Sequence, residues 1–257
     1  TGSYFMWLGS NGKLYAPGGS VPADVTELTV QWTAPTYAVT LHTNGGTINS
    51  GNVTGYTYGV GATLPTADDM TYTGYTFKGW YDNEGLTGSP VTAIGDTETG
   101  NKEYWAKWEA NAYTVTLNTN GGTINNGNVT EYTYGVGATL PTDVTRTGYT
   151  FKGWYDNENL TGSPVTAISN TETGNKEYWA KWEINQYTIT VKPENGKADI
   201  TITQDYGTPI TAPTLTREGY QFNGWDKAFP TTMPAENLTI TAQWRDIAVP
   251  TGEIKIA

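Results

Sequence analysis

The residues TGYTFKGWYDNE occur twice in this chain, at 73–84 and again at 147–158. The residues TETGNKEYWAKWE also occur twice, at 97–109 and at 171–183. Self-similarity at a fixed spacing is the signature of a repeat protein, and missing it leads to the wrong fold. We therefore predict that the chain consists of tandem copies of one module.

A third, divergent copy occupies residues 187–244. It keeps GYQFNGW at 219–225 and ends in AQW, where the longer copies end in AKW. The segment VTELTVQW at 25–32 matches the pattern of NLTITAQW at 237–244. The N-terminal residues are therefore predicted to be the C-terminal part of a fourth copy.

These matches predict where each module begins and ends. Only residues 109–112 separate Trp108 from Tyr113, which is too short for a flexible linker, so we expect an elongated array of semi-rigid modules. The predicted segments are a partial repeat at 1–34, repeat 1 at 35–110, repeat 2 at 111–184, a shortened repeat 3 at 185–245, and a tail or next segment at 246–257.

Composition and periodicity predict a fold that is mainly β, or α+β. The chain contains 31 Gly, 18 Tyr and 10 Trp, and such a mixture favours short strands joined by tight turns. The segment YTVTLNTNGGTI at 113–124 alternates and then reaches Asn-Gly-Gly, which predicts a hairpin turn. Alternation also predicts Tyr149, Phe151 and Gly153 on one face of their strand.

The closing strand of each repeat shows the same alternation. It predicts Tyr178, Ala180 and Trp182 on one face of the strand. Trp179 and Lys181 then lie on the other face.

The order of these motifs resembles the Listeria–Bacteroides repeat, the module represented by the B repeats of internalin B. The motifs are Tyr-x-Val-x-Leu, Asn-Gly-Gly, Gly-Tyr-Thr-Phe-x-Gly-Trp-Tyr and Tyr-x-Ala-Lys-Trp. The resemblance covers residues 37–109, 113–183 and 187–244, and part of 1–32. It implies a small β-grasp-like module, found in tandem on bacterial surface proteins and without catalytic residues.

Charge and cysteine content exclude several classes of function. The net charge of −11 opposes binding to nucleic acid, which requires clustered Lys and Arg. No stretch approaches the roughly 18 apolar residues that a membrane span requires, so we expect no membrane insertion within this fragment. The chain has no Cys, which disfavours zinc–thiolate sites and, in an extracellular protein, is typical of a Gram-positive bacterium.

Residues that could catalyse a reaction or bind a metal ion are not present in every copy of the repeat. The single histidine, His42, has Asn118 as its counterpart in repeat 2, so we interpret it as a surface strand residue. Glu98 and Glu103 recur in repeat 2 but have no evident equivalent in repeat 3. The segment Asp82-Asn83-Glu84 lacks the spacing of a calcium loop and is interpreted as a solvated turn. We predict no enzyme, no cofactor and no metal site.

The tryptophans fall into two classes. Those at the Gly-Trp and closing positions recur in the divergent copy, so we predict that they build the repeat cores. These core aromatics are Trp32, Trp80, Trp108, Trp154, Trp182, Trp225 and Trp244.

Trp105 and Trp179 occur only in the two long repeats, and their counterpart in repeat 3 is Thr241. A position that accepts Thr is not central to a core, so both are predicted to be partly exposed. One interpretation is a stacking platform for a sugar ring or a protein partner. The other, which we favour, is that each packs beneath the longer loop at 95–102 or 169–176.

The predicted function is that of a non-enzymatic, extracellular repeat region of a bacterial cell-surface or secreted protein. It acts as a stalk, as an adhesive module, or as both, with a host or bacterial surface protein or glycan as partner. We expect a monomeric chain. The alternatives are an array of carbohydrate-binding modules and the accessory domains of a larger secreted enzyme.

Overall fold

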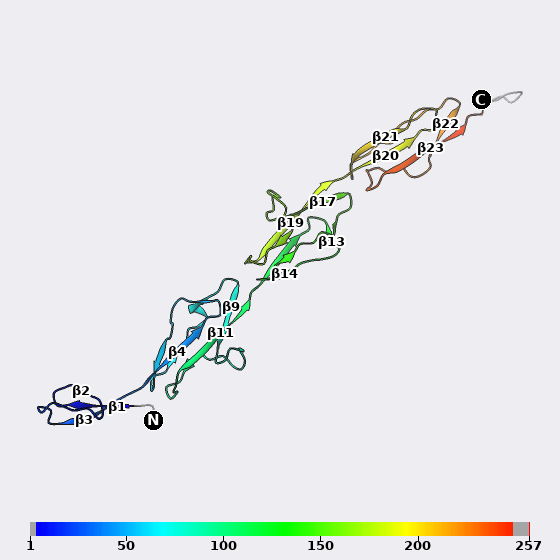
Figure 1. Cartoon of the computed structure of the whole chain (residues 1–257). Coiled ribbons are helices and arrows are strands. Elements are labelled where there is room, and N and C mark those ends of the chain that lie inside the picture. Colours follow the sequence, from blue (N-terminus) through cyan, green and yellow to red (C-terminus); the bar gives the residue numbers. More distant parts are fainter. Residues whose placement is uncertain (1–3, 249–256) are drawn as a thin grey trace. The chain divides into compact units, whose positions relative to one another are not determined.

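A computed structural model describes residues 4–248 and residue 257 (Figure 1). Apart from a short 3-10 turn at Ala67–Asp69, the regular elements within these residues are all strands, so the fold is mainly β. The chain divides into two compact units. Among the described residues, the first unit comprises 4–113, 133–137 and 170–173, and the second comprises the remainder. The expected tail lies mostly outside the described residues.

Repeat 1 is built on a four-stranded sheet with the order β6-β4-β11-β9. The two central strands run parallel, and each outer strand is antiparallel to its neighbour. Two small antiparallel pairs, β5 with β8 and β7 with β10, flank this sheet. The strands are β4 (Thr36–His42), β5 (Thr47–Ile48), β6 (Gly55–Thr57), β7 (Ala62–Thr63), β8 (Met70–Thr71), β9 (Tyr75–Tyr81), β10 (Ala93–Ile94) and β11 (Lys102–Ala110).

Repeat 2 has a sheet of the same form, in the order β14-β12-β19-β17, again with its two central strands parallel. The small pairs recur as β13 with β16 and β15 with β18. The strands are β12 (Ala112–Asn118), β13 (Thr123–Ile124), β14 (Glu131–Thr133), β15 (Ala138–Thr139), β16 (Val144–Thr145), β17 (Tyr149–Tyr155), β18 (Ala167–Ile168) and β19 (Lys176–Ile184).

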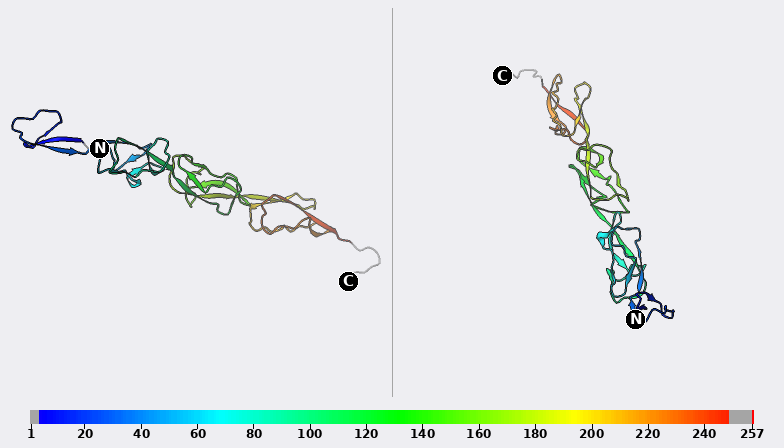
Figure 2. Two further views of the ribbon diagram at one scale, coloured as in Figure 1. Left: turned by 90° about the horizontal axis from the view of Figure 1, so that it is seen from below. Right: turned by 90° about the vertical axis from the view of Figure 1, so that its left-hand side faces the viewer.

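Repeat 3 keeps the four-stranded sheet, in the order β21-β20-β23-β22. Its central strands β20 and β23 are parallel, as in the other repeats. The strands are β20 (Gln186–Lys192), β21 (Ile200–Asp205), β22 (Tyr220–Trp225) and β23 (Leu238–Asp246). Figure 2 shows the same ribbon in two further views, in which the residues of repeat 3 are coloured from yellow to red.

The N-terminal residues form a three-stranded sheet from β1 (Tyr4–Gly9), β2 (Leu14–Tyr15) and β3 (Leu28–Thr33), in the order β2-β1-β3. Phe5 lies opposite Trp32 in this sheet. Phe222 lies opposite Trp244 in the same way in repeat 3. At this position the pairing of β1 with β3 therefore has the same register as the pairing of β22 with β23, which closes repeat 3.

A β-bulge in β17 decides which side chains reach the core of repeat 2. Phe151 lies opposite Trp182, whereas Gly153 lies opposite Lys181, so Lys152 is an extra residue in the pairing. The predicted simple alternation through Gly153 is therefore wrong, because the bulge shifts the following residue by one position. As a result Trp154 contacts Phe151, with ring centroids 5.4 Å apart.

The Asn-Gly-Gly segment turns the chain but does not make the predicted hairpin. β12 has β14 and β19 as its neighbours, whereas β13 after the turn pairs with β16. The turn is instead held against the closing strand, because the Asn120 side chain donates a hydrogen bond of 2.8 Å to the Ala180 carbonyl. In repeat 3 the strands on either side of the corresponding turn, β20 and β21, do pair.

Candidate functional site

The Gly-Trp tryptophans occupy the centres of the two long repeats. Trp80 and Trp154 are 1 % and 2 % exposed. Their indole N–H groups donate to the Pro65 and Pro141 carbonyls at 3.0 Å and 2.9 Å. A buried indole needs such an acceptor, because an unpaired N–H in a core is destabilising. In repeat 3, Trp225 is half-buried and packs on the core around Ile189.

The closing tryptophans tie the last strand of each repeat to the turn after its first strand. Trp108, Trp182 and Trp244 are half-buried. Their indole N–H groups donate to the carbonyls of Thr43, Thr119 and Pro193, at 2.8, 2.7 and 2.8 Å respectively. These residues therefore pack and hydrogen-bond at once.

Trp32 departs from this pattern, and its prediction as a core aromatic is wrong. Its side chain is 64 % exposed. Phe5 packs edge-on against it, with ring centroids 5.3 Å apart. The reason is that its sheet contains only β1, β2 and β3, without the first strand and turn that cover the other closing tryptophans.

Trp105 lies on the opposite face of β11 from Tyr104 and Ala106, which belong to the core of repeat 1. Its indole is half-buried and stacks on the His42 ring, with centroids 4.9 Å apart and planes 13° apart. The Nε2 atom of His42 also makes a hydrogen bond with the Glu103 carboxylate. The stacked ring therefore covers one face of the indole.

A polar cleft of about 360 Å³ lies beside Trp105. Trp105 lies beside residues of the long loop, as the packing interpretation expects. It also lines a cleft, as the binding interpretation expects. The cleft is lined by Asp82, Val91, Glu98, Asn101, Lys102, Glu103, Tyr104 and Trp105.

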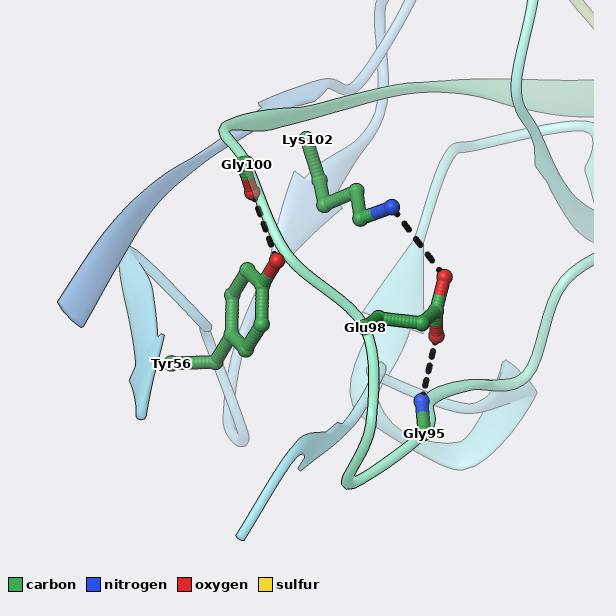
Figure 3. A network of polar contacts seen from close by, with 5 residues as sticks. All are labelled: Tyr56, Gly95, Glu98, Gly100 and Lys102. Atoms are coloured by element: carbon green, nitrogen blue, oxygen red, sulfur yellow. Dashed lines mark hydrogen bonds and ion pairs between the residues drawn. The ribbon is translucent and has the colours of Figure 1, made fainter. Parts of the chain in front are cut away.

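The long loop is held by a network that uses one of the recurrent carboxylates (Figure 3). The Glu98 carboxylate accepts a hydrogen bond from the Gly95 N–H and lies 3.1 Å from the Lys102 ammonium. The Gly95 hydrogen bond, followed by that from Lys102, lowers the pKa of Glu98. The buried Tyr56 donates to the Gly100 carbonyl at 2.6 Å, and burial raises the pKa of its phenol.

Trp179 is half-buried in repeat 2 as Trp105 is in repeat 1, but it faces Asn118 rather than a histidine. The Asn118 amide donates to the Glu177 carboxylate at 3.1 Å and to the Tyr178 carbonyl at 3.2 Å. The recurrent Glu177 therefore fixes a neighbouring amide.

Sequence reasoning missed a recurrent asparagine that joins the two central strands. The side-chain oxygens of Asn101, Asn175 and Asn237 accept hydrogen bonds from the N–H groups of Ala38, Thr114 and Thr188, at 3.0, 3.0 and 2.9 Å. Each Asn precedes the closing strand of its repeat. Alignment of the three copies on that strand would have found it.

The remaining polar motif, Asp82-Asn83-Glu84, is organised by its central amide. Asn83 donates to the Thr87 carbonyl at 2.9 Å and accepts from the Thr87 N–H at 3.1 Å. No group of three His, Cys, Asp or Glu side chains suited to a metal ion occurs in the described part of the chain. The described residues also include no helix that is long and apolar enough to span a membrane.

Comparison with known proteins identifies relatives over most of the chain. The chain is 33 % identical over 226 residues to a predicted membrane protein of Evansella cellulosilytica, which covers 84 % of this chain and 33 % of that protein. It is 32 % identical over 249 residues to a predicted Gly-rich membrane protein of the same organism, covering 91 % of this chain and 27 % of the relative. The chain thus spans about a third or less of these relatives.

Internalin H of Listeria monocytogenes is 32 % identical over 114 residues, which cover 40 % of this chain and 20 % of that protein. The family model of the Listeria-Bacteroides repeat domain matches residues 37–107, 113–181 and 187–243. These are the segments that carry the three four-stranded sheets. With the greater part of its length matched in three successive copies, the chain belongs to the Listeria-Bacteroides repeat domain family.

Proposed function

We propose that this chain is a non-enzymatic, extracellular repeat region of a bacterial cell-surface protein and acts as a stalk, an adhesive module, or both. The observation that carries the proposal is the use of the recurrent polar side chains. Glu98 and Tyr56 hold a loop, Asn101 joins two strands, and the indoles of Trp80 and Trp108 donate to backbone carbonyls. These groups maintain the fold of the repeat, which suits a structural module.

The relatives support a location at the cell surface. Two of them are named as membrane proteins, and the third is an internalin. Because the chain corresponds to about a third or less of the Evansella proteins, their remaining segments are expected to supply anchoring or further binding functions.

We also propose that each repeat is a β-grasp-like module with the predicted boundaries at 35–110, 111–184 and 185–245, arranged as an elongated array. The support is the central pair of parallel strands with an antiparallel strand at an outer edge, as in β4 and β11 with β9. The N-terminal sheet is proposed to be the closing part of a preceding module, because Phe5 faces Trp32.

A carbohydrate-binding array is the second candidate, and the cleft beside Trp105 favours it. Sugars are bound by an aromatic face combined with polar groups that fix their orientation. The cleft offers the Trp105 indole together with Asp82, Asn101 and Glu103. His42 stacks on one face of the indole, and Trp105 also lines the cleft.

The two candidates are separated by a binding assay with the 257-residue chain on arrays of glycans and extracellular proteins. An adhesive role through the indoles predicts binding that is lost in a variant with both Trp105→Ala and Trp179→Ala, with unchanged melting. Trp32→Ala, at an exposed position outside the three repeats, is the control and should bind normally. The stalk role is supported if the parent chain binds nothing on the arrays and the double variant melts at a lower temperature than the parent. Cleavage of any arrayed glycan would contradict the proposal.

A further inference from the structure

A tyrosine of repeat 3 lies against a glycine of repeat 2 within the second compact unit. Gly148 precedes β17, and Tyr206 follows β21. A Cβ atom placed on Gly148 would lie 2.1 Å from Cδ1 of the Tyr206 ring, a distance that no real side chain tolerates. The glycine is therefore required there by close approach, in addition to its positive φ of 80°.

Backbone hydrogen bonds join the same residues through Asn185, which connects the two repeats. The Asn185 N–H donates to the Gly148 carbonyl at 2.9 Å, and the Tyr206 N–H donates to the Asn185 carbonyl at 2.9 Å. The Thr150 hydroxyl donates to the Asn185 side-chain oxygen at 2.6 Å. The connecting residue is thus fixed from both repeats.

Gly148 and Tyr149 form a corner before β17, here called the Gly-Tyr corner, which is also stabilised from within repeat 2. The Arg146 guanidinium lies over the Tyr149 ring, 3.8 Å from its centroid. The Tyr206 ring approaches the same ring edge-on, with centroids 6.2 Å apart. Arg217 covers Tyr220 of repeat 3 in the same manner, at 3.7 Å. The corner therefore presents a preformed aromatic surface.

The same set of contacts occurs in the first compact unit. A Cβ on Gly74 would lie 2.3 Å from the Tyr134 ring. The Asn111 N–H donates to the Gly74 carbonyl at 2.8 Å, and the Tyr134 N–H donates to the Asn111 carbonyl at 2.9 Å. Tyr75 and Tyr134 meet edge-on, with centroids 5.4 Å apart. Because the same contacts occur at both junctions, we infer that they are a general feature of how one repeat joins the next.

We propose that the Gly-Tyr corners of repeats 1 and 2 are docking surfaces, each for the turn that begins with a Tyr-Gly pair in the repeat that follows it, Tyr134-Gly135 or Tyr206-Gly207. In the second unit the surface is Gly148, Tyr149 and Asn185, and its partner is the turn at Tyr206. The contact holds repeats 2 and 3 in one relative orientation. Because it concerns only how the repeats are joined, its failure would leave the proposed location and adhesive role untouched.

The corner of repeat 3 provides a matched control. Gly219 has a φ of 78°, and its carbonyl accepts a hydrogen bond from the Ile247 N–H at 3.1 Å. Among the described residues nothing lies within 4 Å of a Cβ placed there. Gly219→Ala therefore introduces the backbone strain of an Ala at positive φ without a docked ring. Gly148→Ala introduces the same strain and also displaces Tyr206.

The test is a distance distribution between spin labels on repeats 2 and 3, measured by electron–electron double resonance on the full 257-residue chain. The chain has no Cys, so Glu158→Cys and Lys197→Cys at exposed positions accept the labels uniquely. We expect a single narrow distribution in this parent and in Gly219→Ala. The distribution broadens in Gly148→Ala and in Tyr206→Ala, while circular dichroism remains that of the folded chain.

A double variant with Gly148→Ala and Tyr206→Ala should be no broader than either single variant, because both remove one contact. If Gly148→Ala fails to fold, Tyr206→Ala carries the test alone, since it removes a half-exposed ring. A broad distribution in the parent would overturn the proposal. So would narrow distributions in both joint variants, or equal broadening in Gly219→Ala.

Discussion

The indole of Trp108 lies directly against Gly46, so that a Cβ atom on this glycine would fall 2.1 Å from the Cζ2 atom of the indole. The same indole donates its N–H to the Thr43 carbonyl, two residues before the Asn-Gly-Gly turn reaches Gly45. The second glycine of the turn is therefore required by close packing rather than by backbone conformation. The closing strand of the repeat is fastened at this point to the turn after its first strand.

Gly46→Ala is expected to destabilise repeat 1 by about 1–3 kcal/mol, the usual cost of an inserted methyl group in a packed site. Hydrogen exchange of the β11 amides measures the effect within this repeat. The control is Gly95→Ala, because the nearest atom to a Cβ there lies 3.5 Å away on the Glu98 side chain, and repeat 2 has Ser169 at this position. Equal effects of the two substitutions would show that Trp108 does not set the requirement.

Trp80→Ala should destabilise repeat 1 by about 3–5 kcal/mol, because it removes a fully buried aromatic side chain. Trp32→Ala should change stability by no more than about 0.5 kcal/mol, since its side chain is 64 % exposed. Urea unfolding followed by tryptophan fluorescence and by hydrogen exchange compares the two. A similar loss of stability in both variants would contradict the difference in burial between Trp80 and Trp32.

Tyr56→Phe removes the hydrogen bond to the Gly100 carbonyl and should cost about 1 kcal/mol at neutral pH. Burial raises the pKa of Tyr56 in the folded chain. The folded state therefore binds this proton more tightly than the unfolded state, and stability is lost as the pH rises above about 10. Melting temperatures at pH 8 and above pH 10 should fall less with pH in Tyr56→Phe than in the parent. An identical fall in both would contradict this role.

Glu98 should act in the opposite pH range. The hydrogen bond from Gly95, followed by that from Lys102, lowers its pKa in the folded chain. The unfolded state then binds the proton more tightly, so the contribution of Glu98 is present above its ordinary pKa and is lost as the pH falls. Because this side chain is 40 % exposed, we expect less than about 1 kcal/mol. NMR titration of the Glu98 carboxyl carbon in parent and Lys102→Met chains checks the direction: the midpoint should rise in the variant.

The mainly β character of the chain and its repeat pattern could be predicted because they rest on local signals. Alternation in YTVTLN and the recurrent aromatic spacing mark strands and modules directly. The bulge that carries Trp154 to the side of Phe151 could not be foreseen from alternation, because Gly153 alone does not show that the register shifts there. The hairpin prediction at the Asn-Gly-Gly turn failed for a related reason. Gly122 in this turn packs against the indole of Trp182, which lies far away in the sequence.

The candidate site shows the same limit. The recurrence of Trp105 and Trp179 in the long repeats, with Thr241 in repeat 3, was sufficient to predict a partly exposed indole. That His42 stacks on Trp105 depends on the parallel pairing of β4 with β11, which places residues distant in sequence side by side. Trp32 was misjudged because burial depends on partner strands that its sheet does not include.

The most direct test of the proposed function is the labelling of intact cells of a bacterium that carries this gene, with antibodies raised against the 257-residue chain. We expect strong labelling of unpermeabilised cells, its removal by brief treatment with external protease, and its absence from a deletion strain. Labelling that appears only after permeabilisation, and that survives external protease, would contradict a surface-exposed repeat region.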